Sequence, residues 1–251
     1  MRLKKNAIIG IILLVALSVF SCLDEPIIDP PSRPFSVIRV GNLSANVNSL
    51  SIFIDGQQPI SQLNTVLNRE ATPFFDVTAG KRRFTVINSS NDTLYNKQIE
   101  ITAYSELSIF FIGDYSSVDT LNNFKDFLYP EGLTYFDESP VSNRAHLTFI
   151  NIVTVGLDPL TDVPNLDVFD NTNGKDSIVV ENLIGFEMTA FNDASVGGRK
   201  FEFKRYYTNT VVGSDSINVA SGKRYLVFLS GNAISPAVSY FSSDPLPVRG
   251  K

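Results

Sequence analysis

The chain has 251 residues, of which 21 are basic and 26 acidic, so its formal net charge at pH 7 is −5. An acidic surface argues against nucleic acid and against anionic lipid headgroups as partners. The sequence holds one cysteine and one histidine. This composition excludes a metal site built from several thiolates or imidazoles, and it excludes a disulfide within the chain.

Residues 1–21 have the organisation of a bacterial lipoprotein signal peptide. Three basic residues lie among the first five, and an apolar run follows at 7–20 that is too short to span a bilayer. The segment Val-Phe-Ser-Cys at 19–22 resembles a lipobox. We therefore expect cleavage before Cys22 and acylation of Cys22 with palmitate-like chains, which would anchor the protein in a membrane. An ordinary secretory signal with a chance cysteine is the alternative.

Residues 22–35 follow as the acylated cysteine and a proline-rich tether. Asp24 and Glu25 lie close to the cysteine. Such an acidic cluster resembles the signal that exports lipoproteins to the cell surface in some Gram-negative lineages, and a solvated linker is the alternative. Four prolines between positions 26 and 34 favour an extended spacer. The sequence predicts a lipid-anchored outer-membrane protein that faces the cell surface.

The rest of the chain matches itself. The nine residues at 76–84 return at 193–201, and three further pairs recur in the same order: 50–53 with 166–169, 107–113 with 225–231, and 135–140 with 240–245. Collinear pairs of this kind indicate a duplication. We predict two tandem domains, repeat 1 at 36–140 and repeat 2 at 144–247, with a short joint at 140–143.

Each repeat is expected to be built from strands. Apolar and polar residues alternate at 50–54, 84–86, 99–101, 201–203 and 217–219, which is the period of a half-buried strand. Asp55-Gly56 is a strong hairpin-turn dipeptide, and turn residues also gather at 88–92 and 171–174. No helical pattern follows the signal peptide. The sequence predicts an all-β fold of two tandem immunoglobulin-like antiparallel β-sandwich domains.

The order of these segments resembles the domain of unknown function 4397 family, which bacterial exported proteins often carry in tandem. The similarity rests on Leu-x-Ile/Val-Phe at 50–53 and 166–169 and on Asp-x-Thr/Ser-x-Gly at 76–80 and 193–197. The chain departs from the family at 42–46 and 151–157, where it lacks the usual Asn-Ala-Ser-Pro-like turn, and in the insertion 158–162. The resemblance implies fold and location, and no activity.

No catalytic constellation stands out. His146 is expected at the first position of a strand, on the strand face, and no Gly-x-Ser-x-Gly motif accompanies it. Asp137 and Glu138 are adjacent in a linker, where a solvated pair is more plausible than a glycosidase site. The acidic loop 170–176 fails the EF-hand spacing, so we expect a hairpin turn, with a weak calcium site of another geometry as the alternative. We expect no enzyme, no cofactor and no catalytic or metal-binding residue.

Two surface features remain as candidate sites. Tyr206 and Tyr207 are candidate ligand contacts, because adjacent strand residues cannot both face the core, and ordinary packing is the alternative. Basic clusters recur at 81–83 and 199–200; we expect solvated residues that discourage edge pairing, or otherwise a rim for an acidic glycan.

Asp-Thr/Ser-aliphatic triplets occur four times and resemble the acceptor motif for general O-glycosylation of exported proteins in one Gram-negative lineage. Turns that precede a strand are the alternative reading of such triplets. The candidate acceptors are Thr93, Thr120, Ser177 and Ser216.

Taken together, these patterns predict a surface-exposed lipoprotein that acts as a non-enzymatic binding or cell-envelope interaction module. Its partners would be the membrane, through the lipid anchor, and a protein or glycan met by loops of the sandwich. A glycan-capture lipoprotein of a polysaccharide uptake system is the first alternative. A structural spacer is the second, and it would have a surface without pockets.

Overall fold

The computed structural model describes residues 34–115, 124–130, 142–153, 165–190, 192–231 and 236–243. The described strands lie in one compact unit, Phe35–Lys251. The predicted signal peptide, Cys22, most of the tether, Thr120 and the linker pair at 137–138 lie outside the described residues. Among the residues that are described, no helix combines the length and the apolar character that crossing a membrane requires.

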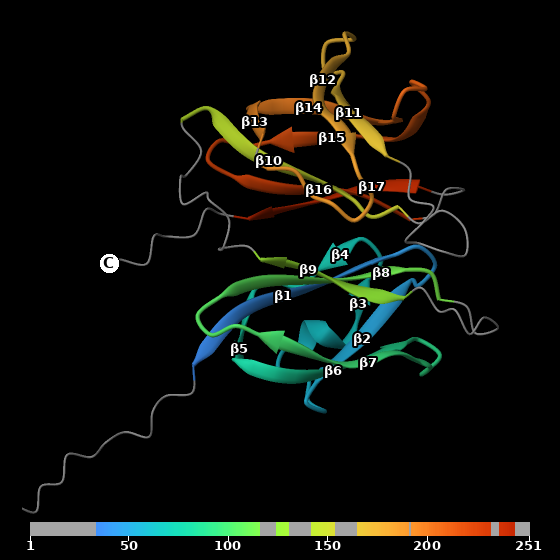
Figure 1. Ribbon diagram of the computed structural model, residues 1–251. Helices are drawn as coiled ribbons and strands as arrows, with labels where there is room; N and C mark the ends of the chain where they lie inside the picture. The colour runs from blue at the N-terminus through green and yellow to red at the C-terminus, as the bar shows by residue number, and fades with distance from the viewer. Residues whose placement is uncertain are drawn as a thin grey trace, which may run out of the picture. The chain divides into compact units, whose positions relative to one another are not determined.

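The described chain is nearly all β-strand, which confirms the predicted fold class (Figure 1). In repeat 1 the elements are β1 (Phe35–Ser44), β2 (Ser49–Ile54), the short 3₁₀ helix η1 (Ser61–Asn64), β3 (Val66–Leu67), β4 (Glu70–Ala71), β5 (Phe75–Thr78), β6 (Gly80–Asn88), β7 (Thr93–Ile101), β8 (Glu106–Gly113) and β9 (Lys125–Pro130). In repeat 2 they are β10 (Arg144–Asn151), β11 (Leu166–Asp170), β12 (Ser177–Leu183), β13 (Asn192–Ser195), β14 (Gly197–Arg205), β15 (Val211–Val219), β16 (Arg224–Gly231) and β17 (Pro236–Ser243).

Both repeats are built from two sheets with the same strand order, apart from β4, which is an extra strand in repeat 1. In repeat 1 the orders are β4-β1-β8-β9, with β5 also paired to β1, and β3-β2-β6-β7. In repeat 2 they are β13-β10-β16-β17 and β12-β11-β14-β15. Among the described strands, none of one repeat pairs with a strand of the other. This common topology supports the duplication, while the boundaries 36–140 and 144–247 stay predictions because residues 131–141 are not described.

One strand pair in each repeat departs from the predicted antiparallel pattern. β1 runs parallel to β8, and β10 runs parallel to β16. Parallel neighbours cannot be joined by a hairpin, so the chain visits the other sheet between them. Alternation along a strand reports which face is buried and says nothing of direction, which is why the sequence did not reveal this pairing.

The core of each repeat lies between its sheets. β2 buries Leu50, Ile52 and Ile54 on one side, as the alternating pattern predicts. In repeat 2, Phe149 of β10 meets two phenylalanines of the opposite sheet edge to face, with ring centroids 5.2 Å from Phe201 and 6.1 Å from Phe203. These contacts across the sandwich hold the two layers together.

A third buried cluster draws residues from both repeats. The ring of Phe110 in β8 lies 4.7 Å from that of Phe228 in β16 and 5.4 Å from that of Phe241 in β17. β8 and β16 are therefore buried on both faces, and nearly every residue along them is buried. Strands covered on both sides have continuous apolar runs rather than alternation, which accounts for the runs at 109–112 and 225–229.

The recurring Asp-x-Thr/Ser-x-Gly segment is the place where the chain changes sheets. β5 pairs with β1 in one sheet, and after one intervening residue β6 pairs with β2 in the other. Gly80 has a φ of 102° and Gly197, at the same place in repeat 2, has a φ of 112°. Backbone with such positive φ favours glycine, so the repeated glycine follows from the bend itself.

The predicted turns are present. Asp55 and Gly56 both have positive φ, 50° and 79°, as a type I′ turn requires. No second hairpin strand follows this turn. The chain after it makes a single β-bridge, between Ile54 and Gln57, and the two neighbours of β2 in the sheet are β3 and β6. Asn88 caps the turn at 88–92 by accepting hydrogen bonds from two backbone N–H groups. Gly174, with a φ of 69°, closes the turn at 171–174.

Candidate functional site

Tyr206 and Tyr207 lie in the turn between β14 and β15. β14 ends at Arg205, so the two tyrosines are turn residues, and the prediction that they are neighbours on a strand is wrong. The Arg205 N–H donates to the Thr210 carbonyl over 2.8 Å, which closes the turn, and the Tyr206 N–H donates to the Asn165 carbonyl over 2.9 Å. Tyr207 has a φ of 63°, in the left-handed region. In this turn Tyr206 is half-buried and Tyr207 is exposed.

The two phenol rings, one half-buried and one exposed, form a single aromatic unit at the surface, which we call the tyrosine turn. Their centroids are 3.6 Å apart with 42° between the ring planes, and the Tyr206 hydroxyl donates to the Tyr207 hydroxyl over 2.6 Å. Tyr207 is 85% exposed. The hydrogen bond to Tyr207, together with desolvation and the nearby charges of Glu181 and Asp167, raises the pKa of Tyr206 to about 12.

Amide and carboxylate groups surround the tyrosine turn. The Asn165 side chain donates to the Asn182 side chain over 2.8 Å, and the Asn182 N–H donates to the Asp167 carboxylate over 2.9 Å. Glu181 precedes Asn182 on β12, and its charge acts on Tyr206. The surface thus combines a flat aromatic face with hydrogen-bonding groups. A ligand with an apolar face and hydroxyl groups could use both.

Replacing Tyr207 with phenylalanine should lower the pKa of Tyr206 from about 12 towards its ordinary value of 10.0, because the hydroxyl that accepts the Tyr206 hydrogen bond is removed. The phenol carbon shifts of labelled tyrosine, followed by NMR through alkaline pH, report this value directly. Tyr104→Phe, at another exposed tyrosine, is the matched control and should leave the Tyr206 titration unchanged. An unchanged pKa in Tyr207→Phe would contradict the hydroxyl pair.

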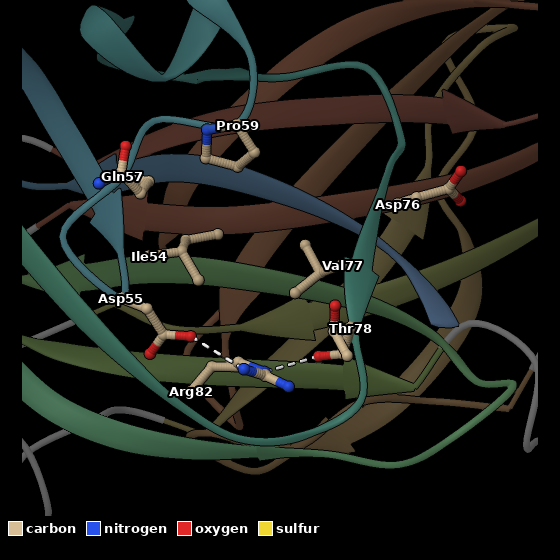
Figure 2. A pocket seen from close by; sticks show the side chains of 8 residues that line it. All are labelled: Ile54, Asp55, Gln57, Pro59, Asp76, Val77, Thr78 and Arg82. Atoms are coloured by element: carbon tan, nitrogen blue, oxygen red, sulfur yellow. Dashed lines mark hydrogen bonds and ion pairs between the residues drawn. The ribbon is translucent and has the colours of Figure 1, made fainter. Parts of the chain in front are cut away.

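Repeat 1 has a cleft of about 170 Å³ beside the sheet-changing bend. Figure 2 shows Arg82 lying across it between Asp55 and Thr78. All three guanidinium nitrogens of Arg82 are engaged: Nε donates to the Thr78 carbonyl over 2.7 Å, Nη2 to the Ala79 carbonyl over 2.7 Å, and Nη1 to Asp55 over 3.0 Å. Arg82 therefore clamps the bend to the β2 turn.

Asp55 completes this clamp. Burial alone would raise its pKa, but the hydrogen bond from the Arg83 N–H and the hydrogen bond and charge of Arg82 outweigh burial and hold that pKa below its ordinary value. The carboxylate therefore stays charged at neutral pH. The charge of Asp55 and its hydrogen-bond partners thus join the β2 turn to the sheet-changing bend beside the repeat 1 cleft.

Repeat 2 has a larger cleft, of about 270 Å³, at the equivalent place. Arg199 occupies the position of Arg82, and its partner is Asp170, the last residue of β11. Asp170 also accepts the Thr172 N–H over 3.0 Å. Within the described chain, the Arg199 Nε is buried and has no hydrogen-bond acceptor. The duplicated arginine is thus satisfied in one repeat and incompletely satisfied in the other.

His146 is the third residue of β10, so the prediction that it begins the strand is wrong by two positions. Its Nε2 lies 3.2 Å from a carboxylate oxygen of Asp193, the residue opposite it on β13. Sequence analysis missed this pair because the two residues are far apart in the chain. The contact is a link between neighbouring strands at the edge of the repeat 2 cleft.

The outer face of β14 carries an ion-pair network that sequence analysis also missed. Lys204, whose side chain is 8% exposed, pairs with Asp176 and lies 3.5 Å from Glu202. Lys200 lies 2.7 Å from the same Glu202, and Asn171 donates to it over 3.1 Å. The alternation at 201–203 predicts a strand with one buried face, and it does not indicate that the polar side chains are buried too. The β11–β12 hairpin instead covers them.

The basic clusters at 81–83 and 199–200 serve internal contacts in the structure. Arg82 and Arg199 pair with carboxylates at the two clefts, and Lys200 belongs to the β14 network. The acidic loop 170–176 forms the predicted turn, with Asp170 and Asp176 both in ion pairs. Over the described ranges, no group of three or more His, Cys, Asp or Glu residues is placed to hold a metal ion.

Three of the four predicted glycosylation acceptors are described. Thr93, Ser177 and Ser216 are exposed. They lie on β7, β12 and β15, each of which is an edge strand of its sheet. Exposure is what a modifying enzyme requires, so these positions stay candidates, while Thr120 lies outside the described residues.

No protein-family model matches the chain. No curated protein matches it either. Several solved structures resemble it, and the three described next are each 10% identical to it. A streptococcal family 41 carbohydrate-binding module that recognises α-glucan has a TM-score of 0.24, with 84% of this chain and 98% of that chain covered. The Bacillus anthracis TIE protein has a TM-score of 0.23, with 79% and 33% covered. A candidate cell adhesion protein from Bacteroides uniformis has a TM-score of 0.26, with 86% and 99% covered.

Proposed function

We propose that this chain is a non-enzymatic binding module of the cell surface, an outer-membrane lipoprotein held by an acylated Cys22. The tyrosine turn is the observation that carries the proposal. Tyr207 is 85% exposed, and the centroid of its ring lies 3.6 Å from that of Tyr206. Folding gains little from such a side chain. Exposed aromatic residues on loops are instead the usual anchors of binding surfaces.

The charged groups at the clefts link neighbouring strands. Arg82 pairs with Asp55 and Arg199 with Asp170, and beside the repeat 2 cleft His146 lies against Asp193. Each pair joins two neighbouring strands of one sheet and so holds the surface around its cleft in shape.

Location follows from the first residues of the chain. Two or three fatty chains on Cys22 suffice for stable anchoring, since each buried CH₂ contributes about 0.8 kcal/mol. The proline-rich tether then joins the strands to the bilayer and limits how far from it they can lie. Such a protein meets its ligand outside the cell, with the membrane and a protein or glycan as its partners.

Glycan capture is the second candidate function. The tyrosine turn favours it because a sugar ring can stack on Tyr207 while its hydroxyls bond to groups such as Asp167, Glu181 and Asn182. A structural spacer would need none of these features. The exposed aromatic pair and the two clefts therefore count against the spacer.

Anchoring and exposure are tested by labelling intact cells with a membrane-impermeant biotin reagent. Wild type should be labelled and should fractionate with the outer membrane, and Cys22→Ala should be released or remain unprocessed, because the acylation site is lost. Ser21→Ala keeps a small residue before the cysteine and should behave as wild type. A periplasmic marker protein must stay unlabelled. If wild type is shielded from the reagent, the surface location is wrong.

A further inference from the structure

The end of repeat 1 that the tether joins carries two exposed aromatic side chains. Phe35, the first residue of β1, is 53% exposed, and Tyr104, in the turn between β7 and β8, is 76% exposed. They are the two most exposed large apolar side chains in the described part of repeat 1. The Tyr104 N–H donates to the Phe35 carbonyl over 2.9 Å, so the two residues are neighbours. We call this surface the tether end and define it as residues 34–36, 78–80 and 101–105.

Strand pairing brings these three segments to one end of the repeat. Phe35 lies opposite Thr78 where β1 begins beside β5 (Figure 1). Gly80 lies opposite Ile101, where β6 begins and β7 ends. The hydrogen bond from Tyr104 to Phe35 then joins the turn after β7 to the start of β1. The tether end is therefore one continuous surface.

The tether end contains no charged residue. Besides the two aromatic rings it offers hydroxyl groups and small side chains. The charged residues that directly flank its segments in the chain are two basic and two acidic ones: Arg33, Lys81, Glu100 and Glu106. The surface is thus locally neutral, although the whole chain is acidic, and it fits a partner that is apolar and carries no net charge.

Repeat 2 shows that the turn itself does not call for these aromatic residues. There the Gly222 N–H donates to the Arg144 carbonyl over 2.9 Å, which is the bond that Tyr104 makes to Phe35 in repeat 1. In each repeat the two residues lie two positions before a paired position of the parallel strands. Gly222 and Tyr104 both have left-handed backbone, with φ of 75° and 59°, a conformation that favours glycine. The copy that the tether joins thus has tyrosine and phenylalanine where the other copy has glycine and a half-buried arginine.

The length of the tether indicates what covers this surface. Twelve residues separate Cys22 from Phe35, and a chain of that length spans at most about 45 Å. Phe35 is also the position at which the tether meets the strands. We propose that the tether end rests against the membrane in which Cys22 is anchored, with Phe35 and Tyr104 in the boundary between headgroups and acyl chains. This inference rests on the lipid anchor of the proposed function.

The chemistry of the tether end suits that boundary. Tyrosine is enriched where a membrane meets water, because its ring is apolar and its hydroxyl can stay hydrated. Two aromatic side chains would hold a free protein only weakly. With Cys22 anchored, contact becomes an intramolecular step at an effective concentration of about millimolar for a short linker, so a small apolar surface suffices. Such contact would hold repeat 1 in one orientation on the membrane.

The test measures the depth of a spin label on the mature acylated chain in phosphatidylcholine vesicles. Acylation consumes the Cys22 thiol, so Ala103→Cys supplies the one free thiol for a nitroxide. Ala103 is exposed and lies beside Tyr104. We expect this label to relax more with oxygen, which concentrates in lipid, than with a water-soluble nickel complex. Ala220→Cys, at an exposed residue of the corresponding turn in repeat 2, is the matched control and should show the reverse.

A second set of variants removes the aromatic residues. Tyr104→Gly and Phe35→Arg install the residues of repeat 2, and in each the label at position 103 should become accessible to nickel, as the label at position 220 is. Because glycine fits the left-handed position, Tyr104→Gly keeps the test interpretable if Phe35→Arg fails to fold. Circular dichroism checks the fold of both. An unchanged label depth in both folded variants would overturn the inference.

Vesicle flotation separates this inference from the proposed function. If the labelled chain floats with the vesicles but the label at position 103 lies in water, the anchor stands and the inference is wrong. A label shielded from both reagents would show that protein covers the tether end, which also overturns it. If the chain does not float, the anchor itself is wrong and the inference falls with it.

Discussion

Phe149→Ala is expected to lower the free energy of unfolding by about 3 to 5 kcal/mol. Phe149 is fully buried, and its ring meets Phe201 and Phe203 of the opposite sheet at centroid distances of 5.2 and 6.1 Å. Truncation removes the favourable free energy of burying the ring. It also leaves a cavity between the two sheets, because their strand pairing prevents them from closing over it. The edge-to-face aromatic contacts are lost as well.

Equilibrium unfolding in urea, followed by circular dichroism, measures this effect. The sequence has no tryptophan, so tyrosine fluorescence is the second probe. Ile178→Ala is the control in the same repeat, because Ile178 is 52% exposed and its loss should change stability by no more than about 0.5 kcal/mol. Equal effects of the two substitutions would show that Phe149 does not bridge the sheets.

Lys204→Ala is expected to lower the free energy of unfolding by about 3 kcal/mol. The Lys204 side chain is 8% exposed and stands between Asp176 and Glu202. Its Nζ also lies 4.5 Å from the centre of the Phe169 ring. Removing the cation leaves Glu202, with a side chain that is 11% exposed, short of one of its two lysine partners. Thermal and urea unfolding measure the loss.

Lys200→Ala is the matched control, because Lys200 pairs with the same Glu202. Its side chain is 46% exposed, so solvent screens the pair and the cost should stay below about 1 kcal/mol. If both lysine variants lost the same stability, burial of Lys204 would not be the cause. The two lysines thus separate the effect of burial from the effect of charge.

The same network predicts how stability depends on pH. The hydrogen bond from Lys200, which outweighs burial, and the bond from Asn171 hold the pKa of Glu202 below its ordinary value of 4.5. Its contribution to stability is therefore present above pH 4.5 and is lost as pH falls through the lowered pKa. The hydrogen bond to Asp176 raises the pKa of Lys204 above its ordinary value of 10.5. The stability that Lys204 contributes is therefore present below pH 10.5 and is lost as pH rises through the raised pKa. Glu202→Gln should flatten the acid side of the stability curve.

The sequence by itself determined the strands, the turns and the repeat. A buried face requires apolar residues at every second position, and left-handed turn positions require residues such as Asp55-Gly56, so both are readable along the chain. The glycine shared by the two repeats could be found in the same way, although its role at the change of sheets became evident only in the structure. The aromatic ligand candidate was also found from sequence, by a wrong argument about strands.

Tertiary structure alone decided the pairings. The parallel partners β1 and β8, the contact of His146 with Asp193, and the ion pair of Lys204 with Asp176 each join residues whose spacing in the chain carries no signal. The two clefts make the same point, since Arg82 and Arg199 have the same local sequence setting and differ because of a residue on a neighbouring strand. Hydrogen bonds and ion pairs depend on distance in space, and the pairing and register of strands that are remote in the chain set that distance.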